Sequence, residues 1–219
     1  MNPDGGGAAS GEIAAEEIAR LQTALADHQK LWREANHRFR NNLQILSSIT
    51  SIRLREAEDH DFRWAMTDLR HRIGALAAIY QEMSASSDPR KVYVDAFLPA
   101  ICTQMVPNDG GKVTVSTMVP HMAIAIDAAI VLAMLTIEAI QLAPRQGQAQ
   151  DDARLRIIVQ IFSRAPGHST LVIANDAPDG ATQKFPVAEA LIAGYVRQLR
   201  GEIADPRQKG LRVDFPVLR

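Results

Sequence analysis

The chain contains an unusually long stretch without helix-breaking residues. Residues 12–56 include neither glycine nor proline, and their apolar side chains recur at the spacing of a helix. This pattern predicts one helix of about 40 residues, well above the average of roughly 11. A helix of this length must pack along its length, which favours a coiled coil or a bundle. The recurring apolar residues are Ile13, Ile18, Leu21, Leu25 and Trp32.

A second helical stretch follows at residues 59–84, which contain no proline. Joined by a short polar turn, the two stretches predict a helical hairpin. A lone hairpin leaves apolar residues such as Ile45, Ile49 and Ile52 without partners. A second copy of the chain would complete a four-helix bundle, so we expect a homodimer. Residues 1–11 are rich in glycine and alanine without an apolar period, and we expect a mobile tail there.

The pattern changes after residues 84–90, which have the composition of a linker. Three helical stretches and four strand-like stretches follow, with residues 155–162 and 170–174 predicted to pair. The predicted fold class is α+β: a hairpin over residues 12–84, then a domain over residues 91–219 with helices on one face of a mixed sheet. The helical stretches are residues 94–105, 127–143 and 187–199, and the strand-like stretches are residues 112–119, 155–162, 170–174 and 211–216.

Charge and composition exclude several classes of protein. Lys plus Arg number 24 and Asp plus Glu 25, a net charge of −1, which gives no overall electrostatic case for nucleic acid. The single cysteine, Cys102, excludes internal disulfides and a zinc ribbon. The longest uncharged apolar run, residues 118–126, is shorter than the roughly 20 residues of a membrane span. With no signal sequence at the N-terminus, we expect a cytoplasmic protein without a membrane span.

One face of the first helix carries groups that can do chemistry. Glu34, His37 and Asn41 lie three and four residues apart, so they share a face of the helix. A neutral imidazole is a nucleophile near neutral pH, and a carboxylate and a carboxamide beside it can assist. An outward histidine on a long helix is more often simply solvated. The packing direction predicted for this segment, opposite to that face, is set by Phe39, Leu43 and Leu46.

The segment HRFRNNLQILSS, residues 37–48, resembles the phosphoacceptor motif of HisKA_2 sensor histidine kinases, HRxKNNLQxxSS. Arg40 stands where that family has lysine. The segment RIGALAAIY, residues 72–80, resembles the second helix of the same module. The resemblance implies that His37 is the phosphorylated histidine and that the hairpin dimerises. Arg38, Arg40 and Asn42 are then candidates for docking a receiver domain, although a solvated basic face is the commoner explanation.

Residues 94–219 are similar in element order to the GHKL ATP-binding domain that follows this module in kinases. The positions that should bind nucleotide do not match. Glu138 aligns with an asparagine that holds Mg²⁺, and Met134 with a catalytic glutamate; a thioether is no ligand for this hard cation. Asn175 replaces the aspartate that binds adenine, and Ala177 and Asp179 replace two glycines.

The family's glycine-rich lid, whose backbone amides hold phosphate, aligns with FPVAE, residues 185–189. This segment has no glycine, and Pro186 removes one amide donor. Together with the other changes, it implies a degenerate GHKL domain that does not bind ATP. We therefore expect no cofactor or metal in the chain itself.

Three functions are compatible with these residues. The first is a histidine phosphotransferase that relays phosphate between His37 and aspartates of response-regulator receiver domains, with Mg²⁺ on the receiver. The second is a phosphatase in which Asn41 orients water to hydrolyse a regulator's phosphoaspartate. The third is a catalytically inactive dimeric scaffold that sequesters a regulator. Of these we favour the relay, in which the C-terminal domain is a rigid flank for docking.

Overall fold

The computed structural model describes residues 5–86, 88, 90–106, 112–146, 154–176, 185–204 and 210–217, with side chains from residue 15 of the first helix and up to residue 143 of α4. By its contacts the chain divides into two compact units, Met1–Asn42 and Leu43–Arg219. The helices are α1 (Gly5–Glu56), α2 (His60–Ala85), α3 (Val94–Gln104), α4 (Ile126–Gln146) and α5 (Pro186–Gln198). The strands are β1 (Lys91–Tyr93), β2 (Val113–Met118), β3 (Ala123–Ala125), β4 (Leu155–Ala165), β5 (His168–Asn175), β6 (Glu202–Ile203) and β7 (Leu211–Pro216).

The two predicted helices of the hairpin are both present. Helix α1 runs for 52 residues and ends at Glu56, as its composition predicts. It begins at Gly5, within the stretch predicted as a tail; residues 5–11 contain four glycines, which have low helix propensity, so local composition did not indicate a helix there. Helix α2 starts after Asp59, whose carboxylate accepts a hydrogen bond from the Phe62 backbone N–H at 2.8 Å.

The packing direction predicted for the middle of α1 is only partly right. Leu43 is buried, but Phe39 and Leu46 are 41% and 49% exposed. A single chain covers only one stripe of a long helix, so apolar side chains outside that stripe stay exposed. The helical wheel alone could not distinguish the stripe covered within the chain from apolar residues that need another partner.

The C-terminal sheet is mixed, as predicted. Its five strands lie in the order β2-β4-β5-β7-β6, with β2 parallel to β4 and the other neighbours antiparallel. The predicted pairing of residues 155–162 with 170–174 is confirmed, with Phe162 opposite Thr170. The sequence did not reveal β6 or the small antiparallel pair of β1 and β3, because strands of two or three residues carry no alternating pattern.

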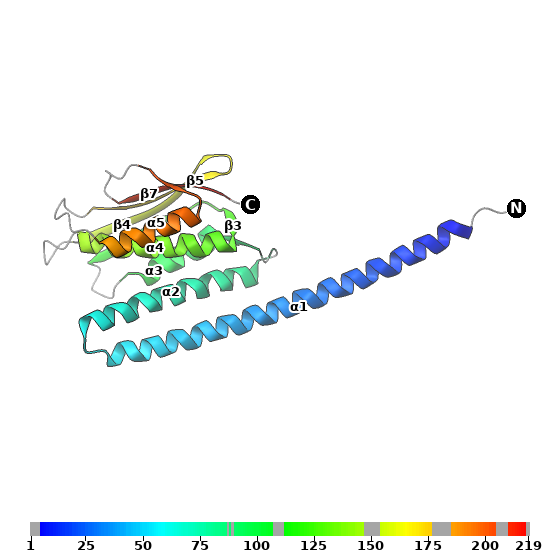
Figure 1. Cartoon of the computed structure of the whole chain (residues 1–219), viewed down its shortest axis with the longest axis horizontal. Helices are drawn as coiled ribbons and strands as arrows, with labels where there is room; N and C mark the ends of the chain where they lie inside the picture. Colours follow the sequence, from blue (N-terminus) through cyan, green and yellow to red (C-terminus); the bar gives the residue numbers. More distant parts are fainter. Residues whose placement is uncertain are drawn as a thin grey trace. The chain divides into compact units, whose positions relative to one another are not determined.

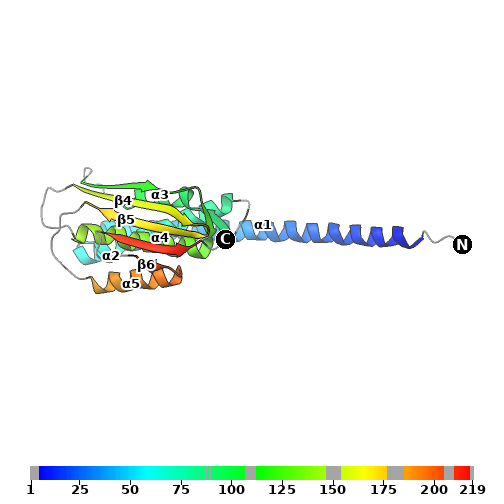
Figure 2. The same cartoon turned by 90° about the horizontal axis from the view of Figure 1, so that it is seen from above.

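The helices cover one face of this sheet, as Figures 1 and 2 show. Helices α3 and α4 pack between the sheet and α2 (Figure 1), and α5 lies beside α4. Alternation along β4 matches this arrangement, since Ile157, Val159 and Ile161 are buried while Arg156 and Phe162 are exposed. The buried core therefore lies between the sheet and α2.

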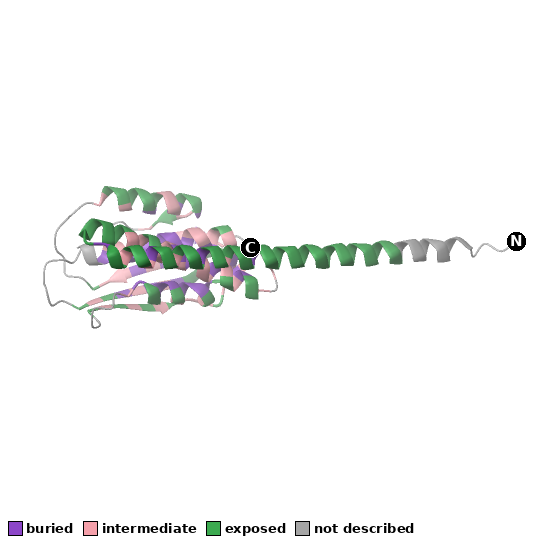
Figure 3. Cartoon of the chain, turned by 90° about the horizontal axis from the view of Figure 1, so that it is seen from below, coloured by how far each residue is buried: buried purple, intermediate pink, exposed green. Residues whose placement is uncertain are grey.

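Helix α4 is the centre of the core. Leu132, Leu135 and Ile137 are fully buried. Figure 3 shows buried segments on both helices and strands of the C-terminal part of the chain. By length and composition, Ile126–Ala143 could cross a membrane, so the apolar run is longer than the sequence analysis recognised. However, 61% of this window is buried inside the fold, as in the core helix of a globular domain.

Candidate functional site: the His37 face and the cluster around Arg72

The structure brings two of the predicted catalytic residues into contact. His37 is exposed on α1, and the Nδ2 atom of Asn41 lies 3.3 Å from its Nδ1. The two residues are four apart on one helix, so a single helical turn stacks their side chains. The contact leaves the other ring nitrogen, Nε2, without an intrachain hydrogen bond among the described residues.

The orientation of the Asn41 carboxamide decides which imidazole nitrogen of His37 carries the proton. With Asn41 Nδ2 facing the ring, the amide donates to Nδ1. Turning the carboxamide over presents its oxygen, which accepts a hydrogen bond from a protonated Nδ1 and leaves the lone pair on Nε2. Asn41 can therefore hold the tautomer in which Nε2 of His37 is the nucleophile.

The other predicted site residues share the helix but make no such contact. Glu34 is exposed, and its side chain makes no hydrogen bond or ion pair among the described residues. Arg38 and Asn42 are exposed and Arg40 is half-buried, all on the same stretch of α1. Their proposed docking role stays a prediction, whereas their accessibility is observed directly for Arg38 and Asn42.

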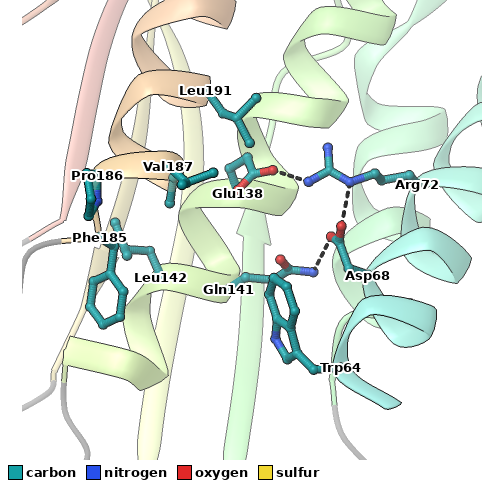
Figure 4. Close-up of a pocket in the computed structure, with 11 residues that line it drawn as sticks. Trp64, Asp68, Arg72, Glu138, Gln141, Leu142, Phe185, Pro186, Val187 and Leu191 are labelled. Atoms are coloured by element: carbon teal, nitrogen blue, oxygen red, sulfur yellow. Dashed lines mark hydrogen bonds and ion pairs between the residues drawn. The ribbon is translucent and has the colours of Figure 1, made fainter. Parts of the chain in front are cut away.

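The position aligned with the Mg²⁺-holding asparagine is occupied by an ion pair. Glu138 on α4 is 5% exposed, and its Oε1 accepts a hydrogen bond from Nη2 of Arg72 on α2. Arg72 Nε donates to Asp68 at 2.8 Å and its Nη1 donates to the Tyr195 hydroxyl at 3.2 Å. Gln141 Nε2 donates to the other oxygen of Asp68 at 2.9 Å (Figure 4). One guanidinium thus links α2, α4 and α5.

The electrostatics of this cluster keep Arg72 charged. Burial alone would lower the pKa of Arg72, but its hydrogen bonds to Asp68 and Glu138 raise that pKa above its ordinary value. A buried carboxylate is stable only when it is paired and hydrogen-bonded, and Arg72 supplies that partner to Glu138. One oxygen of this carboxylate, Oε1, is therefore engaged by a side chain of its own protein.

The remaining positions of the presumed nucleotide site are only partly described. Met134 is buried on α4, where its thioether can act neither as a base nor as a magnesium ligand. Asn175 ends β5, whereas Ala177 and Asp179 lie outside the described residues. Among the residues that the structure covers, no group of three or more His, Cys, Asp and Glu side chains is arranged to hold a metal ion.

The described part of the predicted lid is the first turn of a helix. Helix α5 begins at Pro186, and the Phe185 backbone N–H donates to the Glu189 carboxylate at 3.4 Å. Pro186 itself has no N–H to offer. One backbone N–H at this helix start is therefore engaged within the chain and another is absent, so fewer N–H donors are available to bind a phosphate.

Sequence reasoning missed the residues that fill the site. Arg72 is the first residue of the family-like segment 72–80, and that resemblance assigns it no partner. Sequence spacing carried a partial signal, because Asp68 and Arg72 are four residues apart on α2. The contact with Glu138 joins residues 66 positions apart, which no local pattern reveals.

Two further titratable side chains in this unit have shifted pKa values: Cys102, which is buried, and His71, which is half-buried. Burial raises the pKa of the Cys102 thiol to about 12, and the side chain is 1% exposed, in agreement with its predicted place in the core. Burial also lowers the pKa of His71, and nearby Arg70 adds to that effect. Nδ1 of His71 is buried without a hydrogen-bond partner among the described residues. Neither group has the accessibility of His37.

Comparison with known proteins identifies the class. Residues 34–108 match the HisKA_2 family, described as histidine kinase. The histidine kinase domain of the blue-light activated kinase EL346 from Erythrobacter litoralis superposes with a TM-score of 0.58 and 15% identity, covering 81% of this chain and 94% of that one. A structure of the EL346 kinase itself superposes with a TM-score of 0.58 and 16% identity, covering 80% of this chain and 60% of that one. No curated protein sequence matches.

The fold is therefore that of a histidine kinase domain. Within it, residues 34–108 are a HisKA_2 segment, as the motif around His37 predicted. The structural similarity to EL346 establishes the fold. The sequence identity of 15% is too low to assign an activity, which has to be argued from the site.

Proposed function

We propose that this protein is a histidine phosphotransferase: it exchanges phosphate between His37 and the aspartates of response-regulator receiver domains, and it does not use ATP. The observation that carries the proposal is the pairing of Glu138 with Arg72. It places a charged side chain of the protein where a kinase of this family needs a free magnesium ligand.

The reaction requires little from the protein beyond a positioned nucleophile. Nε2 of His37 attacks the phosphorus of an aspartyl phosphate, the P–N bond forms, and the P–O bond to the aspartate breaks. The aspartate leaves as a carboxylate, and the proton on Nδ1 stays on the ring, where the carboxamide oxygen of Asn41, in its turned-over orientation, accepts a hydrogen bond from it. The reverse reaction returns the phosphoryl group to another receiver. The receiver supplies the Mg²⁺, so this chain contributes orientation and a docking surface.

The chemistry of the C-terminal domain supports the absence of a kinase step. Transfer from ATP would need a metal ligand and a base on α4, and those positions hold the paired Glu138 and the buried Met134. Moving the Glu138 carboxylate to a metal would leave Arg72 without its buried partner, which is costly in a protein interior. We therefore infer that the chain has no cofactor of its own.

Exposed apolar side chains support the homodimer. They lie on both helices of the hairpin, and isolated exposed apolar residues are common, but a row of them on adjacent helices is typical of an interface. We infer that a second copy covers them to form a four-helix bundle. The exposed residues are Ile45, Leu46, Ile49 and Ile52 on α1 and Phe62 and Leu69 on α2.

The receiver is the proposed partner at the His37 face. Receiver phosphorylation sites are acidic, and Arg38 and Arg40 place positive charge within the His37–Asn41 segment, with Asn42 directly after it. Receiver domains act in the cytoplasm, and we propose the same location for this chain. The net charge of −1 gives no electrostatic argument for binding nucleic acid.

A phosphatase is the second candidate, favoured by the exposed carboxamide of Asn41 at 3.3 Å from the histidine. An amide in that position could orient a water molecule toward a receiver's phosphoaspartate. The relay conserves phosphate, whereas the phosphatase releases it as inorganic phosphate. A scaffold that sequesters a regulator would do neither.

Calorimetric titration with ATP and Mg²⁺ tests the proposal. The expected result is no saturable heat of binding and no autophosphorylation of His37. Saturable binding at micromolar ATP would contradict it, because the Arg72–Glu138 pair would then have to open for nucleotide.

A further inference from the structure

A cavity adjoins the Arg72 cluster and has no role in the proposed phosphotransfer. Its volume is about 480 Å³, which is within the range of small-molecule sites in proteins. Helices α2, α4 and α5 contribute its walls, and Figure 4 shows their side chains around it. Most of the lining is apolar or aromatic, from Trp64, Leu142, Phe185, Val187 and Leu191.

The polar end of the cavity presents acceptors. Glu138 uses Oε1 for Arg72, and its Oε2 makes no hydrogen bond or ion pair among the described residues. Gln141 donates through Nε2 to Asp68, and its carbonyl oxygen is likewise unused in the described part of the chain. Arg72, in contrast, directs each of its three nitrogens to a partner. Free acceptors therefore lie beside donors that are already engaged.

The charge of this end is negative. Asp68 and Glu138 carry two negative charges against the one positive charge of Arg72, and these are the charged side chains that line the cavity. A phosphate placed here would face uncompensated carboxylate charge at low dielectric, which disfavours nucleotides. A cation or a neutral donor would instead pair with the free carboxylate oxygen of Glu138.

We propose that the cavity binds a small apolar molecule that carries an ammonium group or another hydrogen-bond donor and no phosphate. The apolar body of the ligand lies among Trp64, Leu142 and Leu191, and its donor meets Glu138 and Gln141. Because the ligand contacts α2, α4 and α5 at once, its binding stabilises their packing. This inference rests on the proposed function, since a chain that binds ATP would use the same region for nucleotide.

Two matched probes test the chemistry with the full-length protein. They share one aromatic ring system and differ in charge: 1-naphthylmethylamine is cationic and 1-naphthalenesulfonate is anionic. Calorimetry is expected to show saturable binding of the amine and at least about tenfold weaker binding of the sulfonate. Equal affinity for both probes, or no binding of the amine up to millimolar concentration, would overturn the proposal.

Two variants of α5 test the location. Ala188→Trp fills the cavity that Ala188 lines, whereas Ala190→Trp adds the same side chain at an exposed position of the same helix outside the lining. The amine should bind at least about tenfold more weakly to Ala188→Trp and with unchanged affinity to Ala190→Trp. Equal weakening in both variants would contradict binding at this cavity.

A measurement on the unaltered chain removes dependence on the fold of the variants. The indole N–H resonance of Trp64 should shift on titration with the amine, while that of Trp32, which does not line the cavity, should stay in place. A shift of neither resonance would overturn the proposal. The same sample titrated with ATP separates the two claims: if ATP saturates the protein, the proposed function fails, whereas loss of amine binding without ATP binding defeats only this inference.

Discussion

The guanidinium of Arg72 on α2 is bonded to the carboxylate of Glu138 on α4, which is 5% exposed. The same guanidinium reaches Asp68 on its own helix and Tyr195 on α5. A helix of the hairpin is therefore attached by charge-assisted hydrogen bonds to the domain that follows it. The Arg72–Glu138 pair lies at the polar end of a cavity lined by α2, α4 and α5.

Replacing Arg72 with methionine should lower the free energy of unfolding by about 3 kcal/mol, because Glu138 is left buried without its partner. The double variant Arg72→Met/Glu138→Met should lose less than the sum of the two single variants. Urea unfolding measures both, with Arg63→Met, an exposed arginine of α2, as control. Equal losses for Arg72→Met and Arg63→Met would show that the ion pair does not join these elements.

The sequence predicted the elements better than it predicted their contacts. The end of α1, the mixed sheet and the antiparallel pair of β4 and β5 follow from local patterns of breakers and alternation. The exposure of Phe39 does not follow from such patterns, because it depends on which stripe of α1 the rest of the chain covers. The start of α1 at Gly5 does not follow from them either, because helix propensities there are weak.

The candidate site was likewise predictable in part. The spacing of His37 and Asn41 on a helix was sufficient to place them together, and the structure adds the 3.3 Å contact. The identity of Glu138 indicated that a magnesium ligand was missing. Its pairing with Arg72 depends on tertiary packing between residues distant in sequence, so the sequence could not reveal that the position is filled.

Ile49→Glu should convert a dimer into a folded monomer. Ile49 is 50% exposed in the single chain, so a glutamate at this position should not destabilise the monomer. In a bundle, however, the second copy would have to bury that charge, which is unfavourable. Light scattering should give twice 24.0 kDa for the unaltered protein and 24.0 kDa for the variant. The control is Met118→Glu, which changes an exposed apolar residue of β2 and should remain dimeric. A monomeric unaltered protein at tens of micromolar would refute the bundle.

His71 should make stability depend on pH. Burial, with the charge of Arg70, lowers its pKa in the folded chain, so the folded state binds fewer protons than the unfolded state. Stability is then complete above the unfolded pKa of about 6.5 and falls as pH drops through that value. His71→Gln should flatten the dependence between pH 7.5 and 5, and His60→Gln, whose side chain is 94% exposed, should not. Identical slopes in urea unfolding would show that His71 does not contribute.

His37→Ala should abolish uptake of phosphate from a phosphorylated receiver, because the imidazole is the nucleophile. Asn41→Ala should retain uptake, slowed at most about tenfold through loss of the hydrogen bond that holds the ring. A phosphatase predicts the opposite pattern, with release of inorganic phosphate surviving in His37→Ala and lost in Asn41→Ala. Equal loss in both variants, in protein that still dimerises, would mean that this face only docks the receiver.

Transfer of label from a phosphorylated receiver, in the absence of ATP, tests the relay most directly. The receiver carries ³²P on its aspartate, and label is followed on both proteins and in free phosphate. The predicted result is an acid-labile, base-stable phosphoramidate on this chain that requires His37 and passes to a second receiver. Label that appears only as inorganic phosphate, or that reaches His37 only from ATP, would contradict the account.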